Sequence, residues 1–320
     1  MHNVSSVVRS VTVRVPAKVN LQLSVGPLRV DGYHEIVSVF HAVNVYDEVI
    51  AADGVPGSGI TLNMEGAGSE YLSNSEDNLV WRAATALAQY ADVALDVELQ
   101  VKKKIPLSGG MAGGSADAAA ALVACDALWR IGLGREELDV LAARLGADVT
   151  FALHGGTAIG TGRGERLTPA LISGQYHWVF AVSDEGLSTP AVYAECDRLR
   201  EGREVQAPTV AEDLMAALRR GDPVAVGKAM RNDLQVAAIS LRPQLELVLE
   251  TGLSFGALGG IVSGSGPTCA FLARDEEQAL DIAAALSGSG MCSTVLHATG
   301  PAHGARVVDS GTSGSILSPR

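Results

Sequence analysis

A glycine-rich loop that runs directly into an alanine-rich helix is the feature that most constrains this chain. Residues 106–125 read PLSGGMAGGSADAAAALVAC. Four glycines in six positions let the backbone wrap closely around a ligand, and alanine is the best helix former. The first N–H groups of a helix have no partner inside the helix and carry partial positive charge. The junction therefore predicts a phosphate site; the alternative is a flexible turn before a packed helix.

The loop does not fit the common phosphate-binding patterns. A P-loop ends in Gly-Lys-Ser/Thr, and no lysine lies between Gly109 and Ser115. The dinucleotide pattern G-x-G-x-x-G and the protein-kinase catalytic-loop signature are also missing. We interpret Ser115 as an N-cap or a phosphate ligand, and Asp117 as an acid in the first helical turn. The positive charge has to come from elsewhere: the three lysines at 102–104 could supply it, although such a run is often a solvated strand end.

Composition limits the remaining classes. The 320 residues suit two domains or one large one. A formal net charge of −12 argues against a general nucleic-acid binder, which needs a basic surface. The longest uncharged apolar run, 118–125, is too short to span a bilayer, and no signal peptide is visible. The cysteines are widely spaced and free of C-x-x-C, as in a reduced compartment: Cys125, Cys196, Cys269 and Cys292. We expect a cytoplasmic protein with neither nucleic-acid nor membrane partners.

The order of elements predicts an α+β fold of two domains, with the first at 11–170, the second at 171–303, and flexible ends at 1–10 and 304–320. The first half alternates apolar and polar residues from 11 to 25, so that Lys18, Asn20 and Gln22 share one face of a strand. That face is either solvated or functional. Helices are expected at 77–91, 115–130 and 135–145, a strand at 97–105 and a hairpin at 155–164. The second half alternates helices (191–200, 210–219, 223–234, 243–251, 275–287) with strands (177–183, 257–263, 268–273, 292–298).

Three further segments could carry chemistry. Lys18 and Asn20 are followed by Asp31-Gly32-Tyr33-His34. Asp148 follows Leu145-Gly146-Ala147, which predicts a position just past a helix C-terminus, where an acid is mildly unfavourable for the helix dipole. A second glycine loop spans 259–267. Other signals are set aside: Gly252-x-Ser254-x-Gly256 lacks the strand that a nucleophile elbow needs, and no His/Cys cluster has zinc-ligand spacing.

Together these segments resemble the GHMP kinases. Residues 106–116 are similar to their second motif, the start of the chain to their first, and 262–268 to their third, so the resemblance covers about 11–300. It implies a ribosomal protein S5 domain 2-like N-terminal domain and a ferredoxin-like C-terminal domain. The combination of 31–34 with 146–149 further resembles the branch that phosphorylates the 2-hydroxyl of a cytidine-diphosphate-linked methylerythritol in non-mevalonate isoprenoid synthesis.

The resemblance also implies roles for single residues. Lys18 and Asp148 match catalytic positions, and Lys103 would lie near the adenine of ATP. The loop that would cradle the ATP phosphates consists of Pro106, Leu107, Ser108, Gly109, Gly110, Met111, Ala112, Gly113, Gly114, Ser115 and Ala116. The substrate side consists of Asn20, the aromatic residues Tyr33, His34 and Tyr193, and the loop Gly264, Ser265 and Gly266. Mg²⁺ would be held through phosphates and waters, without dedicated protein ligands.

The resemblance leaves two alternatives and shows two departures. The alternatives are a GHMP kinase for homoserine or a mevalonate derivative, and a nucleotide-binding regulator without catalysis. Ala112 stands where the family has glycine, and Thr150 where it usually has proline. The implied protein is a monomer or homodimer whose partners are small molecules.

Overall fold

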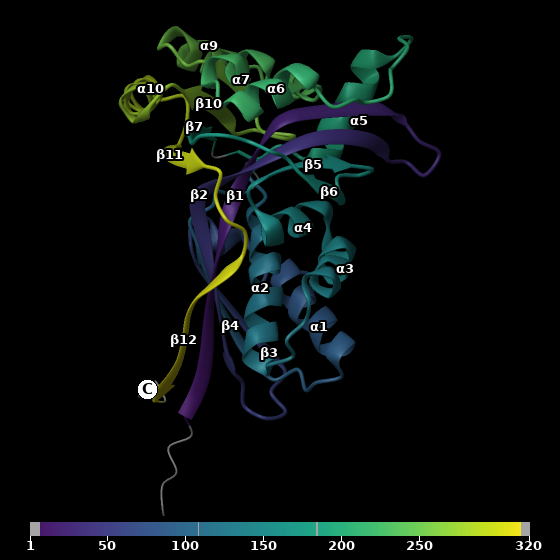
Figure 1. Cartoon of the computed structure of the whole chain (residues 1–320), viewed down its shortest axis with the longest axis vertical. Helices are drawn as coiled ribbons and strands as arrows, with labels where there is room; N and C mark the ends of the chain where they lie inside the picture. The colour runs from purple at the N-terminus through teal and green to yellow at the C-terminus, as the bar shows by residue number, and fades with distance from the viewer. Residues whose placement is uncertain (1–6, 108, 184, 315–320) are drawn as a thin grey trace, which may run out of the picture.

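The computed structural model describes residues 7–107, 109–183 and 185–314. The chain forms two parts stacked along the long axis of the molecule (Figure 1). The elements of the first part are β1 (Val7–Leu28), β2 (His34–Asp53), β3 (Ile60–Gly66), η1 (Ser69–Tyr71), α1 (Leu79–Ala91), β4 (Val97–Lys103), α2 (Gly113–Trp129), α3 (Arg135–Leu145), α4 (Ala147–His154), β5 (Thr157–Thr161) and β6 (Arg166–Pro169).

The first sheet is built around two long strands. Its order is β12-β1-β2-β4-β3, with β12 formed by Arg306–Gly314, and β5 and β6 continue it beside β2. The strands β1 and β2 are 22 and 20 residues long and run from the lower part of the molecule into the upper part (Figure 1). Residues near the middle of β1, including Lys18, therefore lie where the two parts meet.

Helix α2 packs against this sheet through its smallest side chains. The alanines of 118–121 are completely buried, and α2 contacts β1, β2, α1 and α4. Because alanine adds only a methyl group, the helix approaches the strands closely, and the rest of the core fills with valines and leucines of β1, β2 and β4. The alanine run that predicted the helix therefore also sets its depth in the core.

The second part has its own four-stranded sheet. Its elements are β7 (Tyr176–Val182), α5 (Thr189–Arg200), α6 (Glu212–Arg220), α7 (Pro223–Ala229), β8 (Arg231–Asn232), α8 (Gln235–Leu241), α9 (Gln244–Ser254), β9 (Gly259–Val262), β10 (Cys269–Ala273), α10 (Glu276–Ser289) and β11 (Thr294–Gly300). The sheet order β11-β7-β10-β9 is entirely antiparallel. Numbered within this part, the order is 4-1-3-2, and helices follow the first and the third of these strands, which is the expected ferredoxin-like arrangement.

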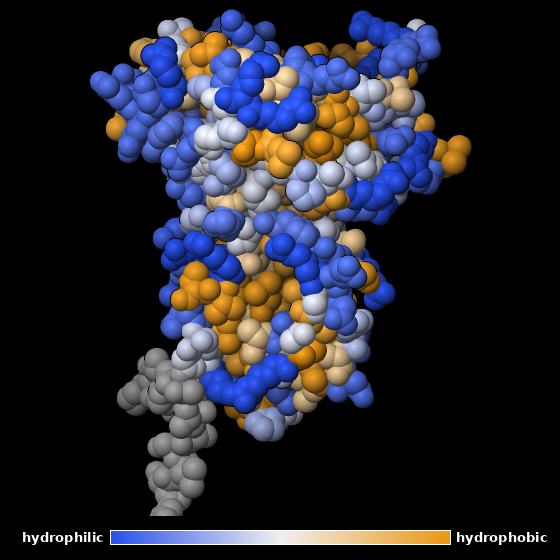
Figure 2. Space-filling model, viewed as in Figure 1, coloured by the Kyte–Doolittle hydropathy of each residue, from blue (hydrophilic) through white to orange (hydrophobic). Residues whose placement is uncertain are grey.

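One hydrophobic cluster spans the two parts, and a separate cluster fills most of the second part. Tyr176, Trp178 and Phe180 of β7 belong to the same buried cluster as the valines of β1 and the alanines of α2. The short strand β8 pairs in parallel with β1 at Gln22 and Leu23. Polar and apolar residues alternate in patches over both parts in the space-filling view (Figure 2). No helix among the described residues combines the length and apolar character needed to cross a bilayer.

Several expectations need correction. The strand face with Lys18, Asn20 and Gln22 is not solvated, because all three residues are buried where the second part covers it. The end expected to be flexible from 304 forms β12, which pairs antiparallel with β1 over Val7–Arg14, so residues 7–10 are also part of the sheet. The short helix α4 and the strand β3 were not expected. The predicted helix at 223–234 ends at Ala229, and α8 follows it.

Candidate active site

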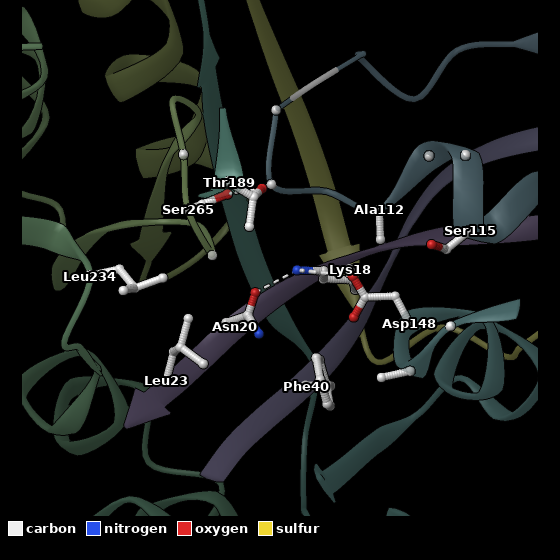
Figure 3. A pocket seen from close by; sticks show the side chains of 18 of the residues that line it. Lys18, Asn20, Leu23, Phe40, Ala112, Ser115, Asp148, Thr189, Leu234 and Ser265 are labelled. Carbon is white, nitrogen blue, oxygen red and sulfur yellow. Dashed lines mark hydrogen bonds and ion pairs between the residues drawn. The ribbon is translucent and has the colours of Figure 1, made fainter. Parts of the chain in front are cut away.

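A cavity of about 510 Å³ opens between the two parts of the molecule. We call it the loop cavity. Its walls come from the middle of β1, the glycine loop before α2, the start of α4, and the segments 187–189 and 264–266 of the second part. Figure 3 shows Lys18 and Asp148 close together, with Ser115 on one side and Thr189 with Ser265 on the other. The three segments singled out by the sequence thus meet at one place.

The glycine loop turns into α2 at Ala112. This residue caps the helix in the left-handed conformation, with φ 60° and ψ 34°, a region that costs a residue with a Cβ about 1–2 kcal/mol. The helix begins at Gly113, so the N–H groups of Gly113, Gly114 and Ser115 have no partner inside it. All three residues line the cavity. Ser115 is therefore not the N-cap, and its place in the first turn leaves the role of phosphate ligand as a prediction.

The structure separates the predicted ATP-binding residues into two groups. Those that line the loop cavity are Pro106, Gly109, Gly110, Ala112, Gly113, Gly114 and Ser115. Met111 and Ala116 point into the core and are buried, so their side chains support the loop from behind. Leu107 does not line the cavity, and Ser108 lies outside the described residues. Gly110 has φ 71°, and a Cβ there would overlap the carbonyl oxygen of Ser263, so the loop can approach the second part only with glycine at this position.

Lys103 anchors the loop through a buried ion cluster. Its ammonium lies 2.5 Å from an oxygen of Asp47 and 2.6 Å from an oxygen of Asp117, and all three side chains are inaccessible to solvent. The other Asp47 oxygen accepts the backbone N–H groups of Lys104 and Ile105. Lys103 therefore does not supply the loop with free positive charge, and Asp117 is a core residue beyond the first turn of α2. Only the backbone of Lys103 is left for contact with adenine, which stays a prediction.

Burial sets the protonation of this cluster. It would lower the pKa of Lys103, but the charges of Asp117 and Asp47 outweigh it and raise that pKa. Burial raises the pKa of the Asp117 carboxyl well above its ordinary value, against the opposing effect of Lys103. One ammonium faces two carboxylates, so the cluster would carry a net negative charge if both were ionised. The second oxygen of Asp117 is buried without a hydrogen-bond partner among the described residues, so it adds nothing that would stabilise the charged carboxylate against burial.

Lys18 and Asp148 form the polar centre of the loop cavity. The Lys18 ammonium donates to Asn20 Oδ1 at 2.6 Å and lies 3.9 Å from Asp148 Oδ2. The Asn20 amide in turn donates to Ser38 Oγ at 2.7 Å, which fixes the carboxamide. Burial lowers the pKa of Lys18 from its ordinary value of 10.5, and Asp148 partly offsets this shift. A buried cation beside a half-exposed carboxylate suits a reaction in which a hydroxyl loses a proton while a transferring group carries negative charge.

Asp148 sits at the start of a helix rather than past the end of one. Gly146 ends α3 and also caps α4, with an extended backbone of φ 159° and ψ 156°, so the chain changes direction there through a single non-helical residue. Asp148 falls in the first turn of α4, where the helix dipole stabilises a carboxylate. The expectation that Asp148 occupies an unfavourable position is therefore wrong.

The second glycine loop, 259–267, closes the cavity from the second part. Asn232 donates to the carbonyl oxygens of Val262 and Gly264 at 2.8 and 2.7 Å, and Ser263 Oγ donates to Gly110 O at 3.0 Å. Gly264, Ser265 and Gly266 line the cavity as expected. The hydroxyls of Ser265 and Thr189 share a hydrogen bond of 2.8 Å. The loop is thus fixed both to its own domain and to the glycine loop opposite.

A second cavity of about 650 Å³ adjoins the first. We call it the tyrosine cavity, because Tyr33 and Tyr193 both line it, together with His34. The rings of His34 and Tyr193 are stacked with centroids 5.4 Å apart. Burial, with the charge of Asp148, raises the pKa of the Tyr193 phenol to about 12. Tyr33 is 54% exposed at the mouth. The structure therefore brings together all three aromatic residues predicted for the substrate side.

Both ring nitrogens of His34 are already engaged. Nδ1 lies 2.9 Å from Gly26 O, and Nε2 lies 3.3 Å from Asp197 Oδ2. Since the ring also stacks on Tyr193, a base cannot insert between these two rings without moving them. Binding of a base by His34 is therefore limited to its backbone or to the cavity side of the stack, and its role stays a prediction.

Sequence reasoning missed three side chains. Asp197 holds His34 from α5, and Asn232 holds the second glycine loop. Arg163 lines both cavities from the turn between β5 and β6. Asp197 and Asn232 do not stand in a distinctive motif. The flanking Gly162 and Gly164 of Arg163 were the only available signal.

Comparisons with known proteins agree with this geometry. The model of the GHMP kinases N terminal domain matches residues 78–156, and that of the GHMP kinases C terminal matches 214–291. A relative from Mycolicibacterium smegmatis, named 4-diphosphocytidyl-2-C-methyl-D-erythritol kinase, is 53% identical over 93% of this chain and 92% of its own. A relative of the same name from Thermobifida fusca is 54% identical over 93% of this chain and 98% of its own.

A solved structure shows the same arrangement. The crystal structure of a 4-(cytidine 5'-diphospho)-2C-methyl-D-erythritol kinase superimposes with a TM-score of 0.73 at 31% identity, and covers 90% of this chain and 98% of its own. The two-domain GHMP kinase fold expected from the motifs is therefore confirmed. The chain belongs to the GHMP kinase family, within the group named 4-diphosphocytidyl-2-C-methyl-D-erythritol kinase.

Proposed function

We propose that this enzyme transfers the γ-phosphoryl group of ATP to the 2-hydroxyl of 4-diphosphocytidyl-2-C-methyl-D-erythritol, giving the 2-phosphate and ADP. The reaction is a step of the non-mevalonate route to isoprenoid precursors. The observation that carries it is the continuity of the two cavities: Lys18 and Asp148 lie beside the glycine loop, and the adjoining cavity is aromatic. The names of the relatives support the same substrate.

Each end of the site has a distinct task. The N–H groups at the start of α2 hold the ATP phosphates, and the aromatic side chains of the tyrosine cavity hold the cytosine. The 2-hydroxyl then lies between Asp148 and the γ-phosphate. Asp148 orients this hydroxyl and accepts its proton, while Lys18 stabilises the negative charge that develops during transfer.

Mg²⁺ is proposed to accompany ATP. The oxygen donors that line the loop cavity near the start of α2 are few, with the Ser115 hydroxyl and the Asp148 carboxylate as the candidates. No cluster of three or more metal-ligating side chains occurs in the described ranges. This donor set fits an ion that takes most of its ligands from phosphate oxygens and water. Bound there, Mg²⁺ would neutralise phosphate charge.

We place the enzyme in the cytoplasm as a monomer or homodimer. Its four cysteines are all free thiols, and three of them are buried, as expected in a reducing compartment. A net charge of −12 fits small anionic substrates held by local positive groups better than it fits nucleic acid.

The test is a side-by-side measurement of ADP release with the cytidyl substrate, homoserine and mevalonate. We expect turnover with the cytidyl compound only. Homoserine and mevalonate have no ring that could stack on the aromatic side chains of the tyrosine cavity, so neither should be phosphorylated at a comparable rate. Turnover of homoserine without the cytidyl compound would refute the substrate, and ATP binding without turnover of any of the three would favour a regulator.

A further inference from the structure

Arg163 occupies the junction between the two cavities. Six residues line both of them, and Arg163 is the one that carries a charge; the others are Ile36, Gly146, Ala147, Thr189 and Tyr193. The junction is also the path between the two ends of the site. A molecule that reaches from the aromatic side chains to Asp148 has to pass Arg163.

The turn that presents Arg163 is firmly anchored. Gly162 O accepts the Ile36 N–H at 2.8 Å, and the Arg163 N–H donates to Glu165 Oε2 at 2.7 Å. Gly164 has φ 101°, and a Cβ there would meet the Ala147 methyl group at 3.3 Å. The turn therefore packs against the start of α4, next to Asp148, and its two glycines permit this close approach.

The guanidinium is oriented but not neutralised. It lies over the ring of Tyr33, 4.6 Å from the centroid, which is a favourable cation–π distance. Among the described residues it forms no ion pair, whereas Arg29 and Arg242 on nearby surfaces do. Lys18, the other cation of the loop cavity, is already engaged by Asn20 and Asp148. The junction thus has one available positive charge, with donors suited to phosphate oxygens.

We propose that Arg163 binds the diphosphate of the cytidyl substrate and selects for substrates that carry it. This role rests on the proposed function, because the cytosine and the reacting hydroxyl define the two ends of the path. The diphosphate links those ends. Its negative charge would pair with the Arg163 guanidinium, which has no ion-pair partner among the described residues. Stacking on Tyr33 already restricts the conformations of the Arg163 side chain. Binding of the substrate therefore costs little additional conformational entropy.

The experiment compares two ligands that differ only in phosphate. Cytidine 5'-diphosphate and cytidine are titrated calorimetrically into the full-length chain and into the Arg163→Gln variant. We expect the Kd of cytidine 5'-diphosphate to rise about tenfold in the variant, since one partly exposed charge-assisted contact is lost. The Kd of cytidine should stay within about twofold, which is less than 0.5 kcal/mol at a factor of ten per 1.4 kcal/mol. Added NaCl should weaken the binding of cytidine 5'-diphosphate less in the variant than in the wild type.

The matched control is Arg166→Gln, which removes the same charge three residues away. Arg166 is exposed on the same hairpin but lines neither cavity. It should leave both affinities unchanged, and an equal loss in this variant would show a general field effect instead of a contact. Unchanged diphosphate binding in Arg163→Gln would overturn the proposal. Equal loss of both ligands would overturn it too, because Arg163 would then act only by holding Tyr33. A wild-type chain that binds neither ligand would refute the proposed function itself, and this inference with it.

Discussion

Replacing Asp117 by asparagine changes the charge of the buried cluster beneath the glycine loop while keeping nearly the same volume. The wild-type side chain shares the Lys103 ammonium with Asp47, and its Oδ1 atom is buried without a partner. The asparagine amide retains an oxygen for Lys103. The variant therefore removes a titration from the core without opening a cavity.

The size of the effect follows from linkage. Burial raises the folded-state pKa of Asp117 above the unfolded value of about 3.9. Between those two pKa values the folded chain holds a proton that the unfolded chain has lost. The free energy of unfolding then falls as pH rises, by up to about 1.4 kcal/mol per pH unit. The contribution is fully present below the unfolded pKa and is lost as pH rises through the folded pKa. Asp117→Asn has no such loss.

The assay is urea unfolding at a series of pH values, followed by tryptophan fluorescence. As pH rises from the unfolded pKa of Asp117 to its folded pKa, the free energy of unfolding of Asp117→Asn should increase relative to that of the wild type. Asp281→Asn, which removes an exposed carboxyl from α10, should run parallel to the wild type. Parallel curves for Asp117→Asn as well would mean that Asp117 is ionised in the folded state, and the linkage argument would be wrong.

Two further changes test the site. Asp148→Asn should lower kcat by about 10² to 10⁴, the usual range for loss of a general base, while the calorimetric Kd of ATP stays nearly constant; ADP release at the wild-type rate would contradict the role of Asp148. Ala112→Gly should raise the free energy of unfolding by about 1 kcal/mol, because relief of the left-handed strain outweighs the greater freedom of glycine in the unfolded chain. Urea unfolding measures this change, and a less stable variant would show that the loop gains more from the alanine methyl group than it loses to strain.

Local patterns predicted most of the secondary structure. The helix expected at 135–145 has those bounds, and the strands expected at 177–183 and 268–273 are each within one residue of β7 and β10. Such elements are predicted by their hydrophobic periodicity and by the glycines at their ends, and both signals lie within a few residues of each other in the sequence. The helix α4 was missed because it has only eight residues between two glycines, and Asp148 was consequently assigned to the end of α3.

The candidate site depended on contacts that no local pattern contains. Lys103 looked like part of a solvated basic run, yet its partner Asp47 lies 56 positions earlier in the chain. The closeness of Lys18 and Asp148 was expected only from the family resemblance, since 130 positions separate them. Arg163 gave no signal beyond the two glycines that flank it, because an exposed arginine in a turn becomes informative only when the cavities on both sides of it are known.

The pairing of β12 with β1 has a consequence for synthesis on the ribosome. Val7 is paired with Gly314, and the register continues to Arg14 and Arg306, so β1, the earliest strand of the described chain, receives the neighbour on this edge last. Until the segment 306–314 has left the exit tunnel, the β1 edge from Val7 to Arg14 stays open to pairing with other chains. A nascent chain that stalls after β11 would hold nearly every residue of the site and still expose that edge.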